Sequence, residues 1–314
     1  MFKLTHPTRS TGSGEGAHRH GWAEVMVMLK KMEGGKLLLD DFMDYTFDPA
    51  PHKIKYHREY RQPWAGILHH PPDIPEWYNR GGQSARKLLT NKRFLAALPH
   101  LKLIIVLSDY LKQLLRGELT TPIVVIKHPA GVSPRQFDAA AFAAMPLRRV
   151  LQIGWYMKNT MAIYQIDAPK GFRKYHISPD ARWIARSHKR CLSHYIKRPQ
   201  YGETVKSKRL SDSEYDRFMC IGVTFMELID ASANNTILDC IGRNAPLVVN
   251  RHPAAVEYLG KDYPLFYDHI ADAGKLLTVE RCLAAHEHLK AMDKQDLTYE
   301  HFKAQVAAAI SKHC

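Results

Sequence analysis

The sequence predicts an α/β protein made of two successive domains, each built around a parallel β-sheet. A chain of 314 residues is long enough for two domains of ordinary size. Apolar residues make up 45% and charged residues 24%, which is typical of a globular protein. Short apolar runs alternate with helical patterns along the whole chain, and this alternation indicates βαβ units.

The first half contains the pattern of one doubly wound domain, which we place at residues 1–132. Apolar runs typical of strands lie at 2–6, 36–41, 64–70, 101–108 and 121–129. Helical patterns separate several of them, at 22–32, 84–101 and 109–119. Residues 133–147 contain two prolines and no clear strand, so we expect a linker there.

A second series of elements follows and predicts another domain at 148–290, with a terminal helix at 291–314. A strand over 149–153 ends at Gly154, and Ser211 with Glu214 forms a capping box at the start of a helix. A further strand lies at 221–229, another at 245–249, and a helix at 254–260. Two α/β halves joined by a linker make a cleft between them the natural place for an active site.

Residues 231–260 are the most informative stretch of the second domain. A strand leads into a polar loop, which opens a helix stopped by Gly242 or Asn244. Backbone N–H groups at such a helix N-terminus bind anions readily. The alternative is an ordinary helix cap, since these residue types are favoured caps in any protein. The polar residues concerned are Ser232, Asn234, Asn235 and Thr236.

Positive charge is concentrated in one segment, residues 169–210. It holds twelve Lys or Arg against two acidic residues, so +10 of the net charge of +14 lies there. Such concentration indicates an anionic partner, for which a nucleotide, a nucleic acid and a membrane surface are the alternatives. A solvated surface is the plain alternative.

Location and redox state follow from what the sequence lacks. Five scattered cysteines without CxxC pairs argue against a disulfide framework and against a zinc site. No secretory signal or membrane-spanning run is visible, so we expect a cytoplasmic protein. A peripheral contact with an anionic membrane, made through residues 169–210, is compatible with this.

With this order of elements, the second half resembles the donor-binding half of glycosyltransferases of the GT-B architecture, whose two Rossmann-like domains face each other across a cleft. The matching stretches are the strand ending at Asp230, the loop 231–236, the helix 237–244, the strand 245–251 and the helix 254–260. The first half matches in element order only. The resemblance implies a donor that is a nucleotide-diphosphate sugar, held without a metal, and no cofactor.

The resemblance also implies roles for residues of the second half. The loop and helix would hold the diphosphate, and by position the carboxylate of Asp239 would bind the ribose hydroxyls. Where many retaining members carry a pair of glutamates, this chain has Ala231 at the first position with Asp230 before it, so we assign no stereochemistry. Further donor contacts are expected from Gly154, Lys158 and Arg251.

Transfer to a hydroxyl acceptor usually needs a base, and the first half offers candidates at a strand end. Histidine as a residue type suits proton transfer near neutrality, so His69 and His70 are candidates, and Asp73 could act with them or orient one of them. Glu15, Asp40 and Asp41 are rival carboxylates. The glycine-rich loop before the first helix is expected to contact acceptor or donor through Ser13, Gly14 and His20.

We therefore predict a metal-independent glycosyltransferase of glycan biosynthesis, acting on a glycan, a lipid-linked molecule or a protein. Two alternatives come from other classes of protein. One is a basic nucleic-acid-binding protein. This hypothesis is less favoured, because the sequence contains no known nucleic-acid-binding signature. The other is an inactive GT-B homologue that serves as a partner subunit.

Overall fold

The computed structural model of the chain describes residues 1–5, 22–48, 57–78, 84–131, 133, 135–177, 182–195, 204–207 and 210–314. These residues form two compact units. The N-terminal unit contains the described residues up to Pro129 together with Lys294–Cys314, and the C-terminal unit contains Ala130–Asp293. The predicted loop contacts Ser13, Gly14 and His20 lie outside the described residues.

The N-terminal unit has a five-stranded sheet in the order β1-β2-β3-β4-β5, and every pairing in it is parallel. Each strand lies inside one of the five apolar runs of the first half. The strands are β1 Phe2–Leu4, β2 Leu37–Asp40, β3 Trp64–Leu68, β4 Leu101–Val106 and β5 Ile123–Val125.

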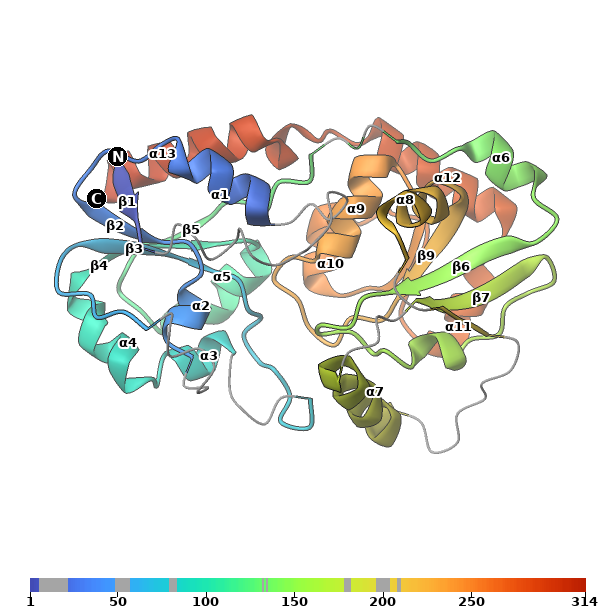
Figure 1. Ribbon diagram of the computed structural model, residues 1–314, viewed down its shortest axis with the longest axis horizontal. Coiled ribbons are helices and arrows are strands. Elements are labelled where there is room, and N and C mark those ends of the chain that lie inside the picture. Colours follow the sequence, from blue (N-terminus) through green and yellow to red (C-terminus); the bar gives the residue numbers. More distant parts are fainter. Residues whose placement is uncertain are drawn as a thin grey trace. The chain divides into compact units, whose positions relative to one another are not determined.

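Helices cover both faces of this sheet, with α1 and α13 on one side and α3, α4 and α5 on the other (Figure 1). A single helix was predicted over 84–101, but Asn91 caps a new helix there and splits it in two. The helices are α1 Trp22–Lys30, α2 Met43–Thr46, α3 Ala85–Leu88, α4 Lys92–Ala97, α5 Asp109–Leu115 and α13 Tyr299–His313, with short 3-10 turns at Leu98–His100 and Gln295–Leu297.

Side chains alternate between the two faces of the sheet, as the period of a strand requires. Trp64 and Leu68 of β3 and Ile104 of β4 belong to the core under α4 and α5. Trp64 is fully buried, and its indole N–H donates to the carbonyl of Ala97 at the end of α4. These contacts hold α4 against one face of the sheet.

The C-terminal unit has a six-stranded parallel sheet in the order β11-β10-β9-β6-β7-β8. From β6 the chain first builds β7 and β8 on one side and then returns to build β9, β10 and β11 on the other. The order therefore reverses between β6 and β9, and open α/β sheets bind ligands at the carboxyl ends of strands at such a point. The strands are β6 Arg148–Ile153, β7 Phe172–Ile177, β8 Val205–Ser207, β9 Gly222–Met226, β10 Leu247–Asn250 and β11 Phe266–Tyr267.

Among the helices of this unit, α8 packs on β6 and β9 and against α9, which in turn contacts α10. The predicted capping box at Ser211 and Glu214 is present at the start of α8. The helices are α6 Ala139–Ala144, α7 Arg182–Tyr195, α8 Asp212–Ile221, α9 Asn235–Arg243, α10 Pro253–Leu259, α11 Ile270–Ala273 and α12 Val279–Ala291, with 3-10 turns at Ala162–Tyr164 and Gly274–Leu276.

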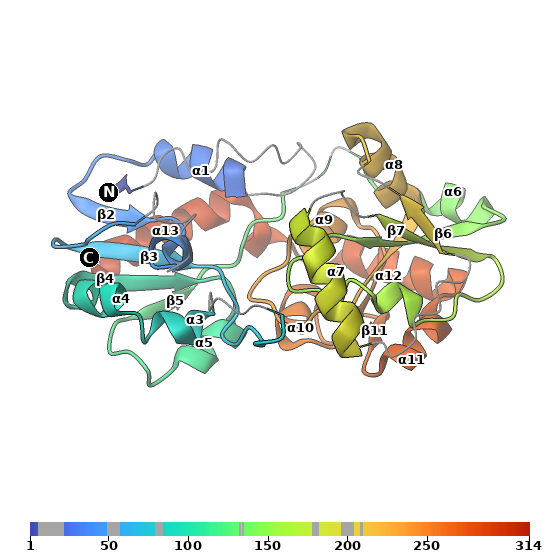
Figure 2. The same cartoon turned by 60° about the horizontal axis from the view of Figure 1, so that its bottom comes forward.

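Three further segments of the chain differ from the sequence prediction. The expected linker at 133–147 contains α6, which Asp138 caps and whose Phe142 is buried within the C-terminal unit. The terminal helix α13 packs on α1 and β4, so it belongs to the N-terminal unit. The helix α7, which was not predicted, lies at the margin of the C-terminal unit in both cartoon views (Figures 1 and 2).

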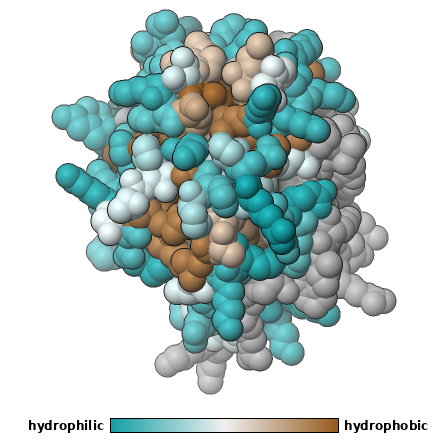
Figure 3. Space-filling view, turned by 90° about the vertical axis from the view of Figure 1, so that its left-hand side faces the viewer, coloured by the Kyte–Doolittle hydropathy of each residue, from teal (hydrophilic) through white to brown (hydrophobic). Residues whose placement is uncertain are grey.

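Figure 3 looks onto the N-terminal unit, where apolar side chains gather in one patch near the top and in another below the centre, among hydrophilic side chains. The exposed large apolar residues of this unit include Met1, Val27 and Leu95, and single residues of this kind are ordinary on protein surfaces. Within the described residues, no helix combines the length and the apolar character that a membrane crossing requires.

Candidate functional site

A buried lysine lies where the strand order of the C-terminal unit reverses. Lys158 follows β6 and is only 4% exposed. Its ammonium group donates to the carbonyl oxygen of Ile153, at 3.1 Å, and to the hydroxyl of Thr236, at 2.6 Å. Thr236 lies in the first turn of α9, after β9, so this bond joins residues 78 apart in sequence across the two carboxyl strand ends.

The helix α9 starts at this bond and has features that suit an anion. Asn234 is its N-cap, with a side-chain oxygen that accepts from the N–H of Thr236 at 3.0 Å. Asn235 is exposed at the first helical position. Ser232, in the preceding loop, is fully buried, and its hydroxyl has no hydrogen-bond partner within the described residues. The first-turn N–H groups and the positive end of the helix dipole add to the charge of Lys158.

Gly154, which directly follows β6, leaves space for the ammonium group of Lys158. Its φ is +80°, a left-handed conformation that glycine adopts without strain. A Cβ atom at this position would lie 2.9 Å from Nζ of Lys158. Backbone geometry and space therefore both favour glycine here.

Arg251, the remaining predicted donor contact, follows β10 and points to other partners. Its guanidinium lies 4.9 Å from the ring centre of Phe266, and its Nε is 3.4 Å from a carboxylate oxygen of Asp268. Its side chain is 44% exposed. The structure thus brings Gly154, Lys158 and Thr236 together and places Arg251 in a separate cluster beside β11.

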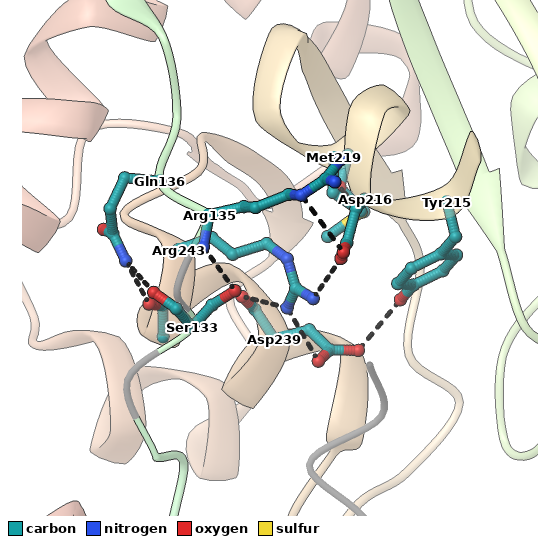
Figure 4. A network of polar contacts seen from close by, with 10 residues as sticks. Ser133, Arg135, Gln136, Tyr215, Asp216, Met219, Asp239 and Arg243 are labelled. Carbon is teal, nitrogen blue, oxygen red and sulfur yellow. Dashed lines mark hydrogen bonds and ion pairs between the residues drawn. The ribbon is translucent and has the colours of Figure 1, made fainter. Parts of the chain in front are cut away.

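Asp239, for which the resemblance implied ribose binding, lies in a buried polar cluster between two helices. It is 1% exposed, and its carboxylate accepts from the hydroxyl of Tyr215 at 2.8 Å and from Arg243 at 3.1 Å. Arg243 also donates to Asp216 at 2.7 Å. Figure 4 shows that these side chains converge between α8 and α9. Burial and the neighbouring carboxylate raise the pKa of Tyr215 well above its ordinary value, so its hydroxyl stays a donor.

The predicted histidines lie together at the carboxyl ends of β2 and β3 in the N-terminal unit. The backbone N–H groups of His69 and His70 donate to the two carboxylate oxygens of Asp44, at 2.8 and 3.0 Å. The imidazole of His69 is stacked on Phe42, with ring centres 3.8 Å apart, and its Nε2 donates to the carbonyl of Asp41. Nδ1 of His70 lies 3.5 Å from the carboxylate of Asp44.

Asp44 takes the orienting position that the sequence suggested for Asp73. The carboxylate of Asp73 is exposed and binds Arg86 at 2.9 and 3.2 Å, so it contacts neither histidine. Asp44 is buried, and burial raises its pKa, while the nearby His70 acts in the opposite direction. A polar contact between Asp44 and two consecutive backbone N–H groups leaves no periodic trace in the sequence, which is why spacing did not reveal it.

We expect His128, at the end of the N-terminal unit, to make the stability of this unit depend on pH. Its Nδ1 donates to the carbonyl of Pro129, and burial lowers its pKa from 6.5 to about 4. Since the folded pKa lies below the unfolded one, the stabilising contribution is complete above pH 6.5 and is lost as the pH falls toward 4. The loss amounts to roughly 3 kcal/mol. We expect His128→Gln to remove this part of the pH dependence, as measured by urea unfolding of both proteins across that range; an unchanged slope in the variant would contradict the assignment.

Comparisons with known proteins bear on the fold. No protein-family model and no curated protein matches the chain. Among solved structures, it is similar to an α,α-trehalose-phosphate synthase (UDP-forming) from Burkholderia vietnamiensis, with 13% identity and a TM-score of 0.58 over 90% of this chain and 73% of that one. A trehalose-6-phosphate synthase from E. coli bound with UDP-2-fluoro glucose has 13% identity and a TM-score of 0.55 over 90% and 74%. A Burkholderia xenovorans synthase in complex with glucose-6-phosphate has 11% identity and a TM-score of 0.57 over 93% and 76%.

The chain has the GT-B fold. The likeness covers about nine-tenths of the chain, and therefore includes the N-terminal unit, which resembled GT-B proteins only in element order at the level of sequence. The predicted fold is confirmed. At identities this low, the shared fold says nothing by itself about the reaction, which must be argued from the residues of this chain.

The sequence analysis did not identify three residues that lie beside the candidate residues of the two units. In the N-terminal unit, Asp44 is the clearest case. In the C-terminal unit, Asn159 and Glu227 bond to each other beside Lys158. Only their place in the sequence could have indicated these three residues, because each lies within a few residues of the end of a predicted strand.

Proposed function

We propose that the protein is a glycosyltransferase that moves a sugar from a nucleotide-diphosphate sugar to a hydroxyl acceptor without a metal ion. The observation that carries the proposal is the buried ammonium of Lys158 against the first turn of α9. A buried cation at a helix N-terminus is suited to a compact anion of high charge, such as a diphosphate. The GT-B neighbours include one bound with UDP-2-fluoro glucose and one in complex with glucose-6-phosphate.

The chemistry of the step explains why such a site would be needed. When the glycosidic bond to the donor breaks, negative charge develops on the departing diphosphate. Lys158 and the N-terminus of α9 would stabilise that charge from fixed positions, and thereby do what a metal ion does elsewhere. Asn234, Asn235 and Ser232 would supply hydrogen bonds to the same group. The nucleotide sugar is then a co-substrate, and no cofactor is required.

For the acceptor, we propose that His69 or His70 removes the hydroxyl proton. The geometry favours His70, because Asp44 lies 3.5 Å from its Nδ1 and would stabilise the imidazolium that forms. His69 is fixed by stacking on Phe42 and by its bond to the carbonyl of Asp41, so it suits the positioning of a sugar ring. The acceptor would be a glycan, a lipid-linked molecule or a protein.

A ligand screen tests the function directly. The melting temperature is measured with UDP-, GDP-, ADP-, dTDP- and CMP-linked sugars, each with and without EDTA. Because a ligand that binds only the folded state stabilises it, we expect a rise with at least one of the diphosphate-linked sugars, unchanged by EDTA. A rise that EDTA abolishes would overturn metal independence.

The outcomes also separate the alternatives. No rise with any nucleotide sugar, together with salt-sensitive RNA binding, would favour a nucleic-acid-binding protein. Binding of a nucleotide sugar without transfer to any acceptor and without donor hydrolysis would favour an inactive homologue acting as a partner subunit.

Gly154→Ala provides a prediction specific to this donor site. The added Cβ atom would push against Nζ of Lys158, the movable end of its side chain, so we expect a folded protein with a displaced ammonium and roughly tenfold weaker nucleotide-sugar binding by calorimetry. Gly117→Ala is the matched control, since Gly117 also has a positive φ, of 86°, but has nothing within 4 Å of the new atom. Equal affinities of the two variants would contradict the prediction.

We further propose that α7 makes a peripheral contact with an anionic membrane. Ser187 and Cys191 on this helix are buried, whereas Arg186 and Lys189 are exposed, and Arg173 lies exposed on β7. A basic outer face of this kind is attracted to anionic headgroups. Co-sedimentation should show binding to vesicles containing phosphatidylglycerol and little binding to phosphatidylcholine alone, with a loss in Arg186→Glu/Lys189→Glu. Equal binding to both kinds of vesicle, or none to either, would contradict this contact.

A further inference from the structure

The loops that follow β6 and β9 are bonded to each other along several residues. The N–H of Asn159 donates to the carbonyl of Glu227 at 2.9 Å, and the N–H of Ile229 donates to the carbonyl of Met157 at 2.9 Å. Lys158 and Leu228 form an antiparallel bridge between these two bonds. The backbone of Lys158 is therefore held between two neighbours that are themselves anchored to the β9 loop.

Side chains strengthen this junction at Asn159. Its Nδ2 donates to Oε2 of Glu227 at 2.6 Å, and its Oδ1 accepts from the N–H of Met161 at 3.0 Å. Its carbonyl accepts from the side chain of Gln152, on β6, at 3.0 Å. Asn159 is fully buried, and burial raises the pKa of Glu227 even though the bond from Asn159 acts in the opposite direction. Glu227 is half-buried, and its partly desolvated carboxylate would lose stabilisation if the amide did not bond to it.

The turn that delivers Lys158 also needs this support. Met157 has a φ of +52°, a left-handed conformation that costs a residue with a side chain of the order of 1 kcal/mol. Such a conformation persists where surrounding bonds fix it, and here the bonds come from the β9 loop. Without them, the turn can relax, and the ammonium of Lys158 would no longer reach Thr236.

We propose that Asn159 and Glu227 are positioning residues for Lys158, and that their bond sets the affinity of the site for the donor diphosphate. Neither residue was predicted from the sequence to take part in the site. The inference rests on the proposed function for its ligand, but the placement of Lys158 by the pair can be measured without any ligand.

The test reverses the direction of the hydrogen bond. Asn159→Asp sets a carboxylate against Glu227, and we expect it to raise the KM for UDP-glucose, or for whichever of the five nucleotide sugars gives product, by roughly tenfold, with kcat changed much less. Glu227→Gln keeps an acceptor for Asn159 and should stay close to the wild type. In the double variant Asn159→Asp/Glu227→Gln, the new amide donates to the new carboxylate, so we expect the KM to return toward that of the wild type. Glu280→Gln, at an exposed position of α12, is the control.

A second measurement makes the inference independent of the reaction. Acetic anhydride labelling followed by peptide mass spectrometry reports how accessible Lys158 is. We expect protection in the wild type and the double variant, and labelling in Asn159→Asp while its melting temperature still shows a folded protein. If Asn159→Asp is folded and leaves both Lys158 protection and donor KM unchanged, or if the double variant restores neither, the inference is overturned. If no nucleotide sugar binds the wild type, but the labelling pattern is as expected, the proposed function fails and the positioning of Lys158 by the pair stands.

Discussion

We expect Lys158→Met to bind the nucleotide sugar at least about thirtyfold more weakly than the wild type, the largest functional effect that we expect from a single substitution. The ammonium is the one buried cation beside the first turn of α9 in the described part of the chain. Removing one partner of a buried, charged hydrogen bond to a ligand costs roughly 2–5 kcal/mol, which corresponds to a factor of about thirty to several thousand. Methionine fills similar space without a charge, so the fold should persist.

Calorimetric titration with the nucleotide sugar that gives the largest thermal shift measures this effect. Lys170→Met is the control, because Lys170 is an exposed lysine at the start of the basic segment 169–210. If general positive charge attracted the donor, the two variants would lose affinity to a similar degree. If Lys158→Met alone loses it, the buried ammonium carries the binding. A Lys158→Met protein that binds like the wild type would refute the donor site.

The fold of this protein could be predicted because its elements are encoded locally. The run Leu103–Val106 is apolar and buried on both faces, as is typical of a strand in a sheet that helices cover on both sides. The side chains of Ser211 and Glu214 each accept a hydrogen bond from the other's backbone N–H. All the residues involved lie within one turn, so a capping box can be recognised from four consecutive residues. In the same way, the polar residues 234–236 marked the start of α9 because helix caps are local.

The parts that could not be predicted depend on contacts between distant segments. Pro134 and Pro146 suggested a linker, yet the alanine-rich run between them becomes α6 once Phe142 can be buried. The sequence analysis considered only the charge of the segment 182–195. The side of this helix that is buried can be recognised only from its contacts with distant residues. One of them is Lys158, whose carbonyl oxygen lies 3.6 Å from Sγ of Cys191. Spacing likewise could not decide between Asp44 and Asp73, since only the folded chain shows which carboxylate meets the histidines.

Asp239 illustrates a further limit, because its position in the helix is the one from which the resemblance implied ribose binding, while its contacts lie with neighbouring side chains. A residue's position along α9 says which turn it occupies, but the direction of its side chain depends on α8. Tyr215 of α8 and Arg243 of α9 bind both carboxylate oxygens of Asp239. The structure therefore assigns this carboxylate to the packing of α8 against α9 (Figure 4).

This assignment leads to the largest stability effect that we expect, from Arg243→Met. Arg243 is 2% exposed and lies between Asp239 and Asp216, so its loss leaves a buried carboxylate without its counter-charge. Breaking a buried ion pair by removing one partner costs roughly 3–5 kcal/mol. The free energy of unfolding, obtained from urea titration at neutral pH, should fall by this amount. Replacing Asp239 by Asn in the same protein removes the unpaired charge, and we expect the double variant to recover a large part of the loss.

The same variants decide between the two roles of Asp239. If its carboxylate binds ribose, Asp239→Asn should weaken nucleotide-sugar binding strongly while Arg243→Met, in which the carboxylate remains, should weaken it little. If the carboxylate serves the packing of α8 and α9, both single variants should have a lower free energy of unfolding than the wild type. Measured well below its melting temperature, each should then bind the donor with a similar and modest loss of affinity. We expect the second pattern, because Thr236 lies one turn before Asp239 on α9, and its bond to Lys158 depends on this helix being held in place.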